Sequence, residues 1–501
     1  MRRPAALVIA LLLIAGGSSA FGGAMLTFGP LVTVSGSPFT LGCNGASQTG
    51  RNFPGAEVEP WVDINPTSTN NVVAAWQQDR WSNGGSNGLV AGVSFDSGAT
   101  WTRTMAPFAH CEGGNASNGG DFERASDPWV SFGPTGTVYQ VSLSFNDSNP
   151  NSAVLASKST DGGLHWSNPA TVILDTTTTV FNDKESITAD PANASLVYVV
   201  WDRLVVPTGR ARGLSFEHAI GFHGPAWFSR STDGGNTWAA PRIIFDPGEV
   251  NQTIGNQILV LPNGNLVDGF NLIYNFKNAQ GVRGFNVALI RSADKGLTWS
   301  SPVIVSKLLS KPVNDPNTGQ AIRTGDILPA FAVDRKSGRL YAVWMDTRFT
   351  GKDDIAFATS GDGGVHWTTP VKINQTPGNS PAFTASVQVG PDGRIAVTYY
   401  DFRSVAAGNI TTLPTDYWVV NCFSTCTKPA SWTEQHLAGP FDMLLAPPTT
   451  TGFFVGDYEG LGSALQSTND VFQPVFVMTL SGGDPTDVFT RSATTPEMLS
   501  P

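Results

Sequence analysis

The sequence predicts an all-β protein, a single β-propeller of four-stranded antiparallel blades. Three observations lead to this prediction: a short motif that recurs along the chain, strand-like segments before each copy, and a composition rich in turn residues. Of the 501 residues, 54 are Gly and 34 are Pro, and only 14% are charged. Such a composition is expected of many short strands joined by tight turns.

The motif has the pattern S-x-D-x-G-x-x-W. Its five copies lie at residues 94–101, 159–166, 231–238, 292–299 and 360–367. Their starts are 65, 72, 61 and 68 residues apart, which exceeds a solenoid repeat and fits one four-stranded blade with its loops. In each copy we expect the Asp carboxylate to accept hydrogen bonds from its own turn, the glycines to adopt positive φ and the Trp to cover the turn.

These copies resemble the Asp boxes, or BNR repeats, of the sialidase superfamily, and they extend over nearly all of the mature chain. The resemblance implies a β-propeller whose boxes lie on the rim, away from the substrate. Sialidases of that superfamily have six blades and use an arginine triad, a tyrosine nucleophile assisted by a glutamate, and an aspartate acid/base. The chain lacks the Arg-Ile-Pro tripeptide that carries the first triad arginine, and residues 51–54 (RNFP) match it only loosely. The triad is therefore not assigned.

The segments before the boxes align as repeated units of an opening strand, a turn and a β-rich second strand. A seventh unit begins at Asp457, and after an expected third strand at 487–491 the chain ends without a fourth. Residues 30–35 resemble the last strands of other units, such as 302–306. We therefore predict seven blades closed by the N-terminal strand, which removes exposed strand edges, with six blades as the alternative.

Residues 1–20 have the pattern of a signal peptide, with two arginines, an apolar run and small residues before a cleavage site. The predicted organisation is a signal peptide at 1–20 and a propeller at 21–501. The apolar run is short for a membrane span, and an uncleaved anchor is the alternative. A net charge of −10 disfavours nucleic acid and anionic membranes as partners. We expect a secreted or extracytoplasmic monomer without membrane insertion after cleavage.

The four cysteines suit an oxidising compartment. We predict that Cys43 pairs with Cys111 and that Cys422 pairs with Cys426, where a sixth box has decayed and a disulfide replaces its turn. The C-x3-C spacing has no companion ligands nearby, and the histidines do not cluster, so no zinc site is predicted.

The blade topology indicates which residues carry chemistry. If the boxes connect third to fourth strands on one face, then the innermost strands start, and the second strands end, on the opposite face. We predict that one funnel there gathers the strand-start residues Glu59, Asp127, Glu185, Asp326, Asp457 and Tyr458, and at least two of the second-strand arginines Arg80, Arg203, Arg348 and Arg403. The box aspartates should lie on the opposite side: Asp96, Asp161, Asp233, Asp294 and Asp362.

Carboxylates facing each other across a funnel suit glycosidic bond cleavage. Arginines beside them suit the carboxylate of a sialic or uronic acid. Repeated Asp and Arg residues fit a scaffold equally well, for example bridges between blades. The acidic strand starts also fit caps for backbone N–H groups, or a structural calcium site in the channel. No other cofactor is predicted.

Catalytic groups are expected among the exceptions to the repeat. Tyr458 lies between Asp457 and Glu459 and is a candidate nucleophile. Lys184 and Arg124 add cations outside the repeated pattern. Residues 399 and 400, both tyrosines, fit a packed pair as well as a reactive one.

Two functional hypotheses follow. The first is an exported, sialidase-like glycoside hydrolase that acts on acidic glycans, of exo-α-sialidase type if it is an enzyme. The second is a noncatalytic BNR propeller that binds glycans or a protein partner at the cell surface.

Overall fold

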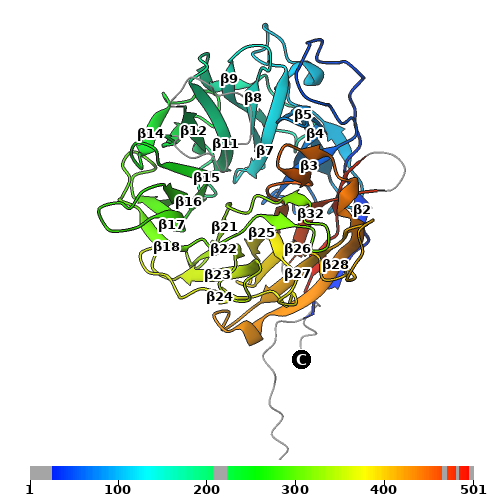
Figure 1. The fold of residues 1–501 in the computed structure, drawn as a ribbon. Coiled ribbons are helices and arrows are strands. Elements are labelled where there is room, and N and C mark those ends of the chain that lie inside the picture. Colours follow the sequence, from blue (N-terminus) through cyan, green and yellow to red (C-terminus); the bar gives the residue numbers. More distant parts are fainter. Residues whose placement is uncertain (1–24, 207–222, 465–470, 481–484, 496–501) are drawn as a thin grey trace, which may run out of the picture.

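The computed structural model describes residues 25–206, 223–464, 471–480 and 485–495. The predicted signal peptide lies outside these residues, so its cleavage stays a prediction. The described chain is built almost entirely of strands, which form sheets around a common central axis (Figure 1). None of the helices in these ranges has the length and apolar character needed to cross a membrane.

The sheets divide into four-stranded antiparallel units that follow one another along the chain. The first three comprise β3 (Glu57–Ile64), β4 (Val72–Arg80), β5 (Ser86–Ser94) and β6 (Thr102–Thr104); β7 (Arg124–Phe132), β8 (Val138–Phe145), β9 (Ser152–Ser159) and β10 (Ala170–Asp175); and β11 (Val180–Ala189), β12 (Val197–Val205), β13 (Ala226–Ser231) and β14 (Arg242–Phe245). A single residue pair, Ser86 with Ala125, joins the first two units into one larger sheet.

The next three units repeat this order. They comprise β15 (Gln252–Val260), β16 (Leu266–Tyr274), β17 (Gly284–Ser292) and β18 (Val303–Lys307); β21 (Ala330–Val333), β22 (Leu340–Asp346), β23 (Asp354–Ser360) and β24 (Val371–Lys372); and β25 (Ala382–Val389), β26 (Ile395–Asp401), β27 (Pro414–Cys422) and β28 (Thr433–Asp442). Their middle strands are buried on both faces and rich in β-branched and aromatic residues, as expected of sheets packed between neighbours.

The N-terminal segment completes the last unit. This unit contains β31 (Gly460–Ser463), β32 (Val471–Met478), β33 (Asp487–Thr490) and β2 (Val32–Thr33). Val32 pairs with Thr490 and Thr33 with Phe489, while β1 (Thr27–Phe28) and β34 (Ala493–Thr494) extend the sheet. The predicted closure by the N-terminal strand is therefore confirmed.

The innermost strands contact one another in the order β3, β7, β11, β15, β21, β25 and β31, and β31 contacts β3 again. The ring of sheets in the described residues is thus closed, and its units are compatible with the predicted seven blades. Closure leaves no innermost strand without neighbours on both sides, which is the usual solution to edge-strand exposure in propellers.

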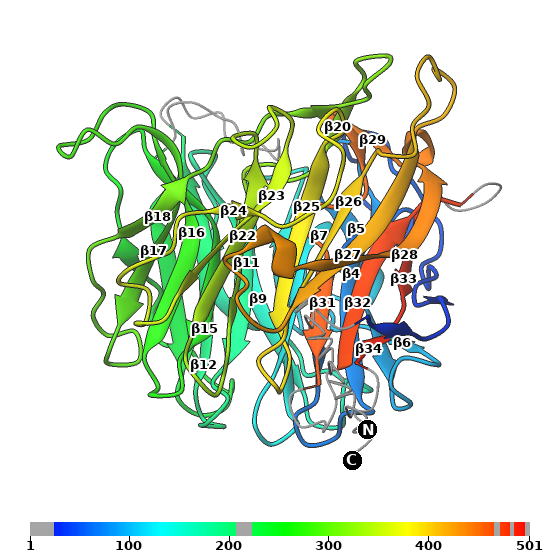
Figure 2. The same cartoon turned by 90° about the horizontal axis from the view of Figure 1, so that it is seen from below.

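Strand register separates the two faces of the ring. In the first blade Val72 pairs with Ser94 of the box, whereas Arg80 pairs with Ser86 and Glu57 pairs with Gln78 at the other end. The box turn therefore lies at the opposite end of the blade from the strand start. In the side view, β20 and β29 lie towards the upper edge and β6 and β34 towards the lower edge (Figure 2).

The Asp boxes have the predicted local geometry. Asp233 accepts hydrogen bonds from the backbone N–H of Thr237 at 2.9 Å and from its hydroxyl at 2.6 Å. Ser231 donates to the same carboxylate at 2.8 Å, and its hydroxyl oxygen accepts a bond from Gly235 N. The same backbone bond to the box aspartate recurs in the other four copies.

Both predicted disulfides are present. The Cα atoms of Cys43 and Cys111 lie 5.0 Å apart, and those of Cys422 and Cys426 lie 5.8 Å apart. The second bridge closes the turn between β27 and β28, where the first five blades carry a box, and Trp432 donates its indole N–H to the Cys426 carbonyl at 2.8 Å. A covalent link therefore replaces the aspartate turn, and both bridges are typical of an extracytoplasmic protein.

A small additional sheet lies outside the repeat. It contains β19 (Val313–Asn314), β20 (Ala321–Arg323), β30 (Gly452–Phe454) and β29 (Pro448–Thr449). β20 pairs in parallel with β30, so that Arg323 lies beside Phe454. Two segments far apart in the sequence are thereby joined immediately before the start of the last blade.

Candidate functional site

The innermost strands share a β-bulge at the strand start. The pairing of β3, β7 and β11 with their second strands shifts at residues 58–61, 126–129 and 183–186. At each shift one residue adopts a left-handed backbone: Glu59 (φ 54°), Asp127 (φ 53°) and Lys184 (φ 48°). A bulge redirects the side chain, and such strained positions concentrate at functional sites. β15 and β25 carry the same feature at Gly255 and Thr384.

The bulges correct the sequence alignment of the third blade. We placed Glu185 in register with Glu59 and Asp127, but Lys184 occupies their left-handed position. Lys184, one residue before Glu185, is therefore the structural equivalent of Glu59 and Asp127, and the spacing of the sequence does not show this. A cation therefore stands where the two preceding blades carry a carboxylate.

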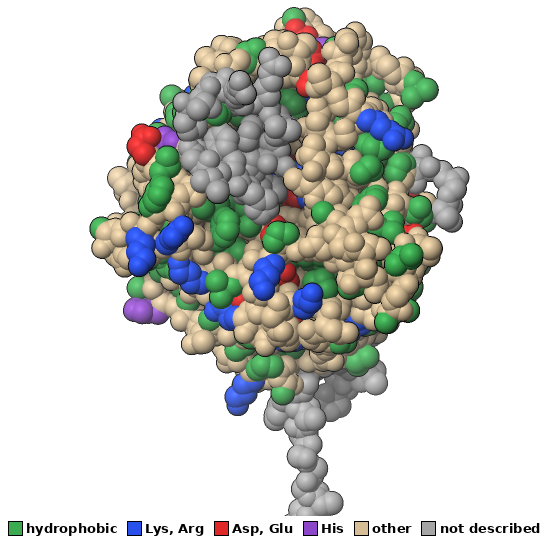
Figure 3. All heavy atoms as spheres, viewed as in Figure 1, with side chains coloured by type: hydrophobic (Ala, Val, Ile, Leu, Met, Phe, Trp, Pro, Cys, Tyr) green, Lys and Arg blue, Asp and Glu red, His purple; other side chains and the backbone are tan. Residues whose placement is uncertain are grey.

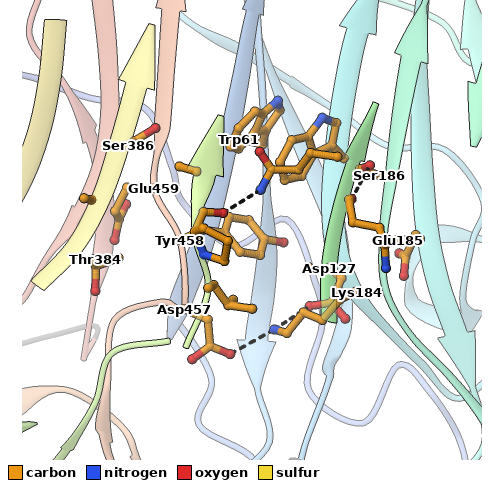
Figure 4. Close-up of a pocket in the computed structure, with 18 residues that line it drawn as sticks. Trp61, Asp127, Lys184, Glu185, Ser186, Thr384, Ser386, Asp457, Tyr458 and Glu459 are labelled. Carbon is orange, nitrogen blue, oxygen red and sulfur yellow. Dashed lines mark hydrogen bonds and ion pairs between the residues drawn. The ribbon is translucent and has the colours of Figure 1, made fainter. Parts of the chain in front are cut away.

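Lys184 is the centre of a buried ionic cluster. Its Nζ atom lies 3.3 Å from Glu59 Oε1, 3.3 Å from Asp127 Oδ1 and 2.9 Å from Asp457 Oδ2. All four side chains are almost fully buried. Figure 4 shows Lys184 extending between Asp127 and Asp457, with Tyr458 directly beside them. The cluster joins the first, second, third and last blades at the channel.

Arg323 completes the cluster from the additional sheet. Its Nε donates to Asp457 Oδ1 at 2.9 Å, and its guanidinium lies 4.5 Å from the Phe454 ring centroid. Arg80 lies 5.0 Å from the same ring. The sequence analysis did not identify Arg323 because its segment belongs to no repeat. The one sequence feature that could have pointed to Arg323 is the insertion that lengthens the connection between the fourth and fifth blades.

Glu59 lies at the inner side of this cluster. Gln77 donates to its Oε2 atom, and Arg80 donates to Gln77 Oε1 at 2.6 Å. Burial raises the pKa of Glu59 to about 8, since loss of hydration together with the charges of Asp457 and Asp127 outweighs the attraction of Lys184.

A pocket opens beside the cluster, with Asp127, Lys184, Glu185 and Asp457 among its charged lining residues. Glu185 is 2% exposed, and neither of its carboxylate oxygens accepts a hydrogen bond of standard geometry from a described residue. Burial raises the pKa of Glu185 well above its usual range, and the charge of Asp127 raises it further. Burial therefore favours the protonated form of Glu185.

Aromatic rings form another wall of this pocket. Trp61 and Trp129 stack with ring centroids 3.4 Å apart and planes inclined by 21°, and Tyr458 lies 6.1 and 5.7 Å from them. Tyr458 donates its hydroxyl to the Pro128 carbonyl at 3.4 Å. Burial raises the pKa of Tyr458 well above 10, and the charges of Glu59 and Asp127 add to this effect. A neutral phenol is a weak nucleophile, so the geometry does not favour that role.

The remaining wall of the pocket carries no charge over most of its length. It consists of Gly255, residues 328–330 (LPA) and residues 384–386 (TAS) from the fourth, fifth and sixth blades. Glu459 also lines the pocket, with Oε1 accepting a hydrogen bond from the Tyr400 hydroxyl at 3.0 Å. The charged groups thus lie mainly on the side formed by the first three blades and the last.

None of the four predicted arginines lines the pocket. Arg203, Arg348 and Arg403 donate to carboxylates of Asp175, Asp346 and Asp401, respectively. Arg203 thereby reaches the outer strand of the preceding blade, and Arg348 reaches Ser306 of the preceding blade at 3.0 Å. The prediction that at least two of the four point into the funnel is wrong, because their charges are used between and within blades.

Other candidates also lie elsewhere. Arg80 is buried under Phe454 and does not line the pocket. Asp326 lies near Asp353, contributing to the raised pKa of that group, and it is also not part of the lining. Arg124 is enclosed by Gln48, Thr49 and residues 83–84.

Tyr399 and Tyr400 are packed core residues. The Tyr399 hydroxyl contacts Glu434, and that of Tyr400 contacts Glu459 and the Val477 carbonyl. Within the described ranges, no group of three or more His, Cys, Asp or Glu side chains is arranged to hold a metal ion. The channel carboxylates surround Lys184 instead, and a structural calcium ion stays a prediction.

On the face viewed in Figure 1, Lys and Arg side chains lie mainly over the lower left part, with few Asp and Glu side chains beside them (Figure 3).

Comparison with known proteins gives one family match: residues 226–407 match the BNR repeat-like domain. Similar solved structures include a protein of unknown function from Dyadobacter fermentans, at 17% identity over 74% of this chain and 95% of that chain, TM-score 0.44. An α-L-arabinanase of Penicillium chrysogenum has 11% identity over 94% and 100%, TM-score 0.47. The NanB sialidase of Streptococcus pneumoniae has 9% identity over 94% and 99%, TM-score 0.42. No curated protein matches the chain.

The match covers the third to fifth boxes and the blades around them. The first two boxes have the same hydrogen bonds and lie in blades of the same order. Residues 226–407 are thus similar to the BNR repeat-like domain, and all five boxes lie in a closed ring of four-stranded sheets, which is a β-propeller.

Proposed function

We propose that the protein is an exported glycoside hydrolase whose active site is the pocket at the channel. The observation that carries this proposal is the contrast between two neighbouring carboxyl groups, Glu185 and Asp127. Burial raises the pKa of Glu185 well above its usual range, whereas Asp127 lies 3.3 Å from the Lys184 ammonium. Two carboxyl groups in such different surroundings suit acid-assisted glycosidic cleavage.

In this reaction Glu185 donates its proton to the leaving glycosidic oxygen as the bond from that oxygen to the anomeric carbon breaks. Asp127 stabilises the positive charge that develops on the sugar ring. A water molecule then adds its hydroxyl to the anomeric carbon, and its remaining proton returns to a carboxylate. Lys184 acts as a positioning residue, because it holds Asp127 and Asp457 in place from a bulge of its own strand.

The more specific hypothesis, an acidic glycan bearing sialic or uronic acid, requires a cation free to bind the substrate carboxylate. Lys184, the cation lining the described pocket, is shared by three carboxylates, and Arg323 is paired with Asp457. The carboxylates of Asp127 and Asp457 would repel an anionic sugar. The geometry therefore supports a neutral glycan better than an acidic one, and exo-α-sialidase activity is the less favoured form of the proposal.

The noncatalytic alternative is favoured by the same ionic cluster. Lys184 joins four blades, so its carboxylate partners also serve as a closing link of the ring. In that case the pocket binds a glycan or a protein partner without turnover.

The test is hydrolysis of a panel of neutral and acidic aryl glycosides and oligosaccharides by the purified mature protein. We expect turnover of a neutral substrate and a fall of about 10²–10⁴ in kcat for Glu185→Gln. Glu112→Gln is the matched control, since Glu112 is also a buried glutamate with a raised pKa but lies outside the pocket. Absence of turnover across the panel, or equal losses in both variants, would reject the proposal.

A further inference from the structure

Two tryptophans occupy equivalent positions in adjacent blades. Trp61 in β3 and Trp129 in β7 each follow the left-handed bulge residue by two positions, in the sequences Glu59-Pro-Trp61 and Asp127-Pro-Trp129. The bulges direct both indoles to the same side of the pocket, where their rings stack 3.4 Å apart (Figure 4). Glu59, Asp127 and this aromatic pair are therefore positioned by the same two bulges.

Trp61 and Trp129 differ from the core tryptophans in their exposure and in the hydrogen bonding of their indole N–H groups. Trp61 and Trp129 are half-buried and line the pocket, whereas Trp76, Trp201 and Trp344 are fully buried. The indole N–H groups of those three core residues donate to side chains of their own blades.

For the pocket pair, no hydrogen bond joins either indole N–H to any residue in the described part of the chain. Each indole covers one face of the other, and aromatic rings with an N–H donor that line a cavity are typical of a binding surface.

We propose that Trp61 and Trp129 form a subsite for an uncharged sugar ring. The C–H face of the ring would pack on the indoles, and sugar hydroxyl oxygens would accept hydrogen bonds from the two N–H groups. Tyr458 limits the subsite on the side nearest Lys184. This inference rests on the proposed function, because it assumes that the glycan enters this pocket, and it assigns the substrate class that the pocket accepts.

The neighbouring groups explain why the ring should be uncharged. Asp127, Glu185 and Asp457 line the same pocket, and the ammonium of Lys184 is already shared among three carboxylates. A carboxylate on the bound sugar would gain no free cation and would lose its hydration on entering. A neutral ring loses only hydroxyl hydration, which hydrogen bonds from the indole N–H groups would partly replace.

Binding is measured with Glu185→Gln, so that hydrolysis does not consume the ligand. The protein is applied to an array of neutral and acidic oligosaccharides, and the strongest ligands are titrated by calorimetry. We expect neutral ligands, and a loss of affinity of at least about tenfold when Trp129→Ala is added. Trp129→Phe should recover part of that affinity, because it keeps an apolar ring.

Trp238→Ala in the same Glu185→Gln background is the control, since Trp238 belongs to a box on the opposite face, and it should leave affinity unchanged. Circular dichroism identifies any variant that fails to fold, and Trp129→Phe keeps the test valid in that case. Binding only to acidic glycans, no glycan binding at all, or full affinity in folded Trp129→Ala would overturn the inference. If neutral glycans bind through Trp129 but the wild-type protein hydrolyses none, the hydrolase proposal fails and the subsite stands.

Discussion

The box turns and the channel mouth place acidic residues in opposite environments. Asp233 is exposed and bonded to groups at most four residues away, and the hydrogen bonds from Thr237 lower its pKa to about 2. Glu185 is buried, neither of its carboxylate oxygens accepts a hydrogen bond of standard geometry from a described residue, and burial raises its pKa well above the usual value. Local hydrogen bonds stabilise the charged form on one face, whereas burial stabilises the neutral form on the other. The aspartates of the boxes therefore stabilise turns, whereas Glu185, which belongs to no box, is suited to proton transfer.

The largest effect is expected at Lys184. Lys184→Met leaves three buried carboxylates without their shared cation, and breaking a buried ion pair by removing one partner costs about 3–5 kcal/mol. Urea unfolding of the purified variant measures this loss. Lys277→Met, at an exposed loop position, should stay within about 0.5 kcal/mol of wild type. Equal stability of both variants would show that the cluster does not hold the ring together.

The pH dependence of stability separates the two groups of acids. Because the folded-state pKa of Glu59 is raised from 4.5 to about 8, its contribution is fully present below pH 4.5 and is lost as pH rises towards 8. The slope from this group is at most about 1.4 kcal/mol per pH unit. The box aspartates act in the other direction: with pKa values lowered from 3.8 to about 2, they lose their contribution as pH falls through that range.

Unfolding free energies measured from pH 2 to 9 should therefore rise from pH 2 to about 4 and decline between about 5 and 8. Glu59→Gln removes one titrating group and should flatten the decline without changing the acidic limb. An unchanged alkaline slope in this variant would contradict the raised pKa of Glu59.

The smallest effect is expected at a single box. Asp233→Asn weakens one exposed turn, so the midpoint of thermal unfolding should fall by less than in Lys184→Met. Turnover per folded molecule, normalised by circular dichroism, should equal that of wild type. Loss of turnover in well-folded Asp233→Asn would place the functional face on the box side of the ring.

Features that follow from the repeated pattern of strands and turns could be predicted from the sequence. The box turns depend on residues within eight positions, and the ring closure follows from a missing last strand together with a matching N-terminal segment. The replacement of the sixth box by the Cys422–Cys426 bridge was visible for the same reason.

The site depends on features that spacing does not encode. A bulge of one residue puts Lys184, not Glu185, beside Asp127, and an insertion outside the repeat delivers Arg323 to Asp457. The arginine prediction failed because second-strand ends are also where neighbouring blades meet, so Arg203 and Arg348 bridge them. Repetition in the sequence marked the scaffold, and departures from it marked the pocket.

The most direct test of this contrast is the protonation state of Glu185 in the folded protein. Infrared difference spectra between wild type and Glu185→Gln, recorded at pH 7 with glutamate carboxyl groups labelled with ¹³C, isolate this one carboxyl group. We predict that the wild-type protein shows the C=O band of a protonated carboxylic acid. This band should be absent from Glu185→Gln and should remain in the control variant Asp233→Asn. A carboxylate band at that pH would contradict the assignment of Glu185 as the proton donor.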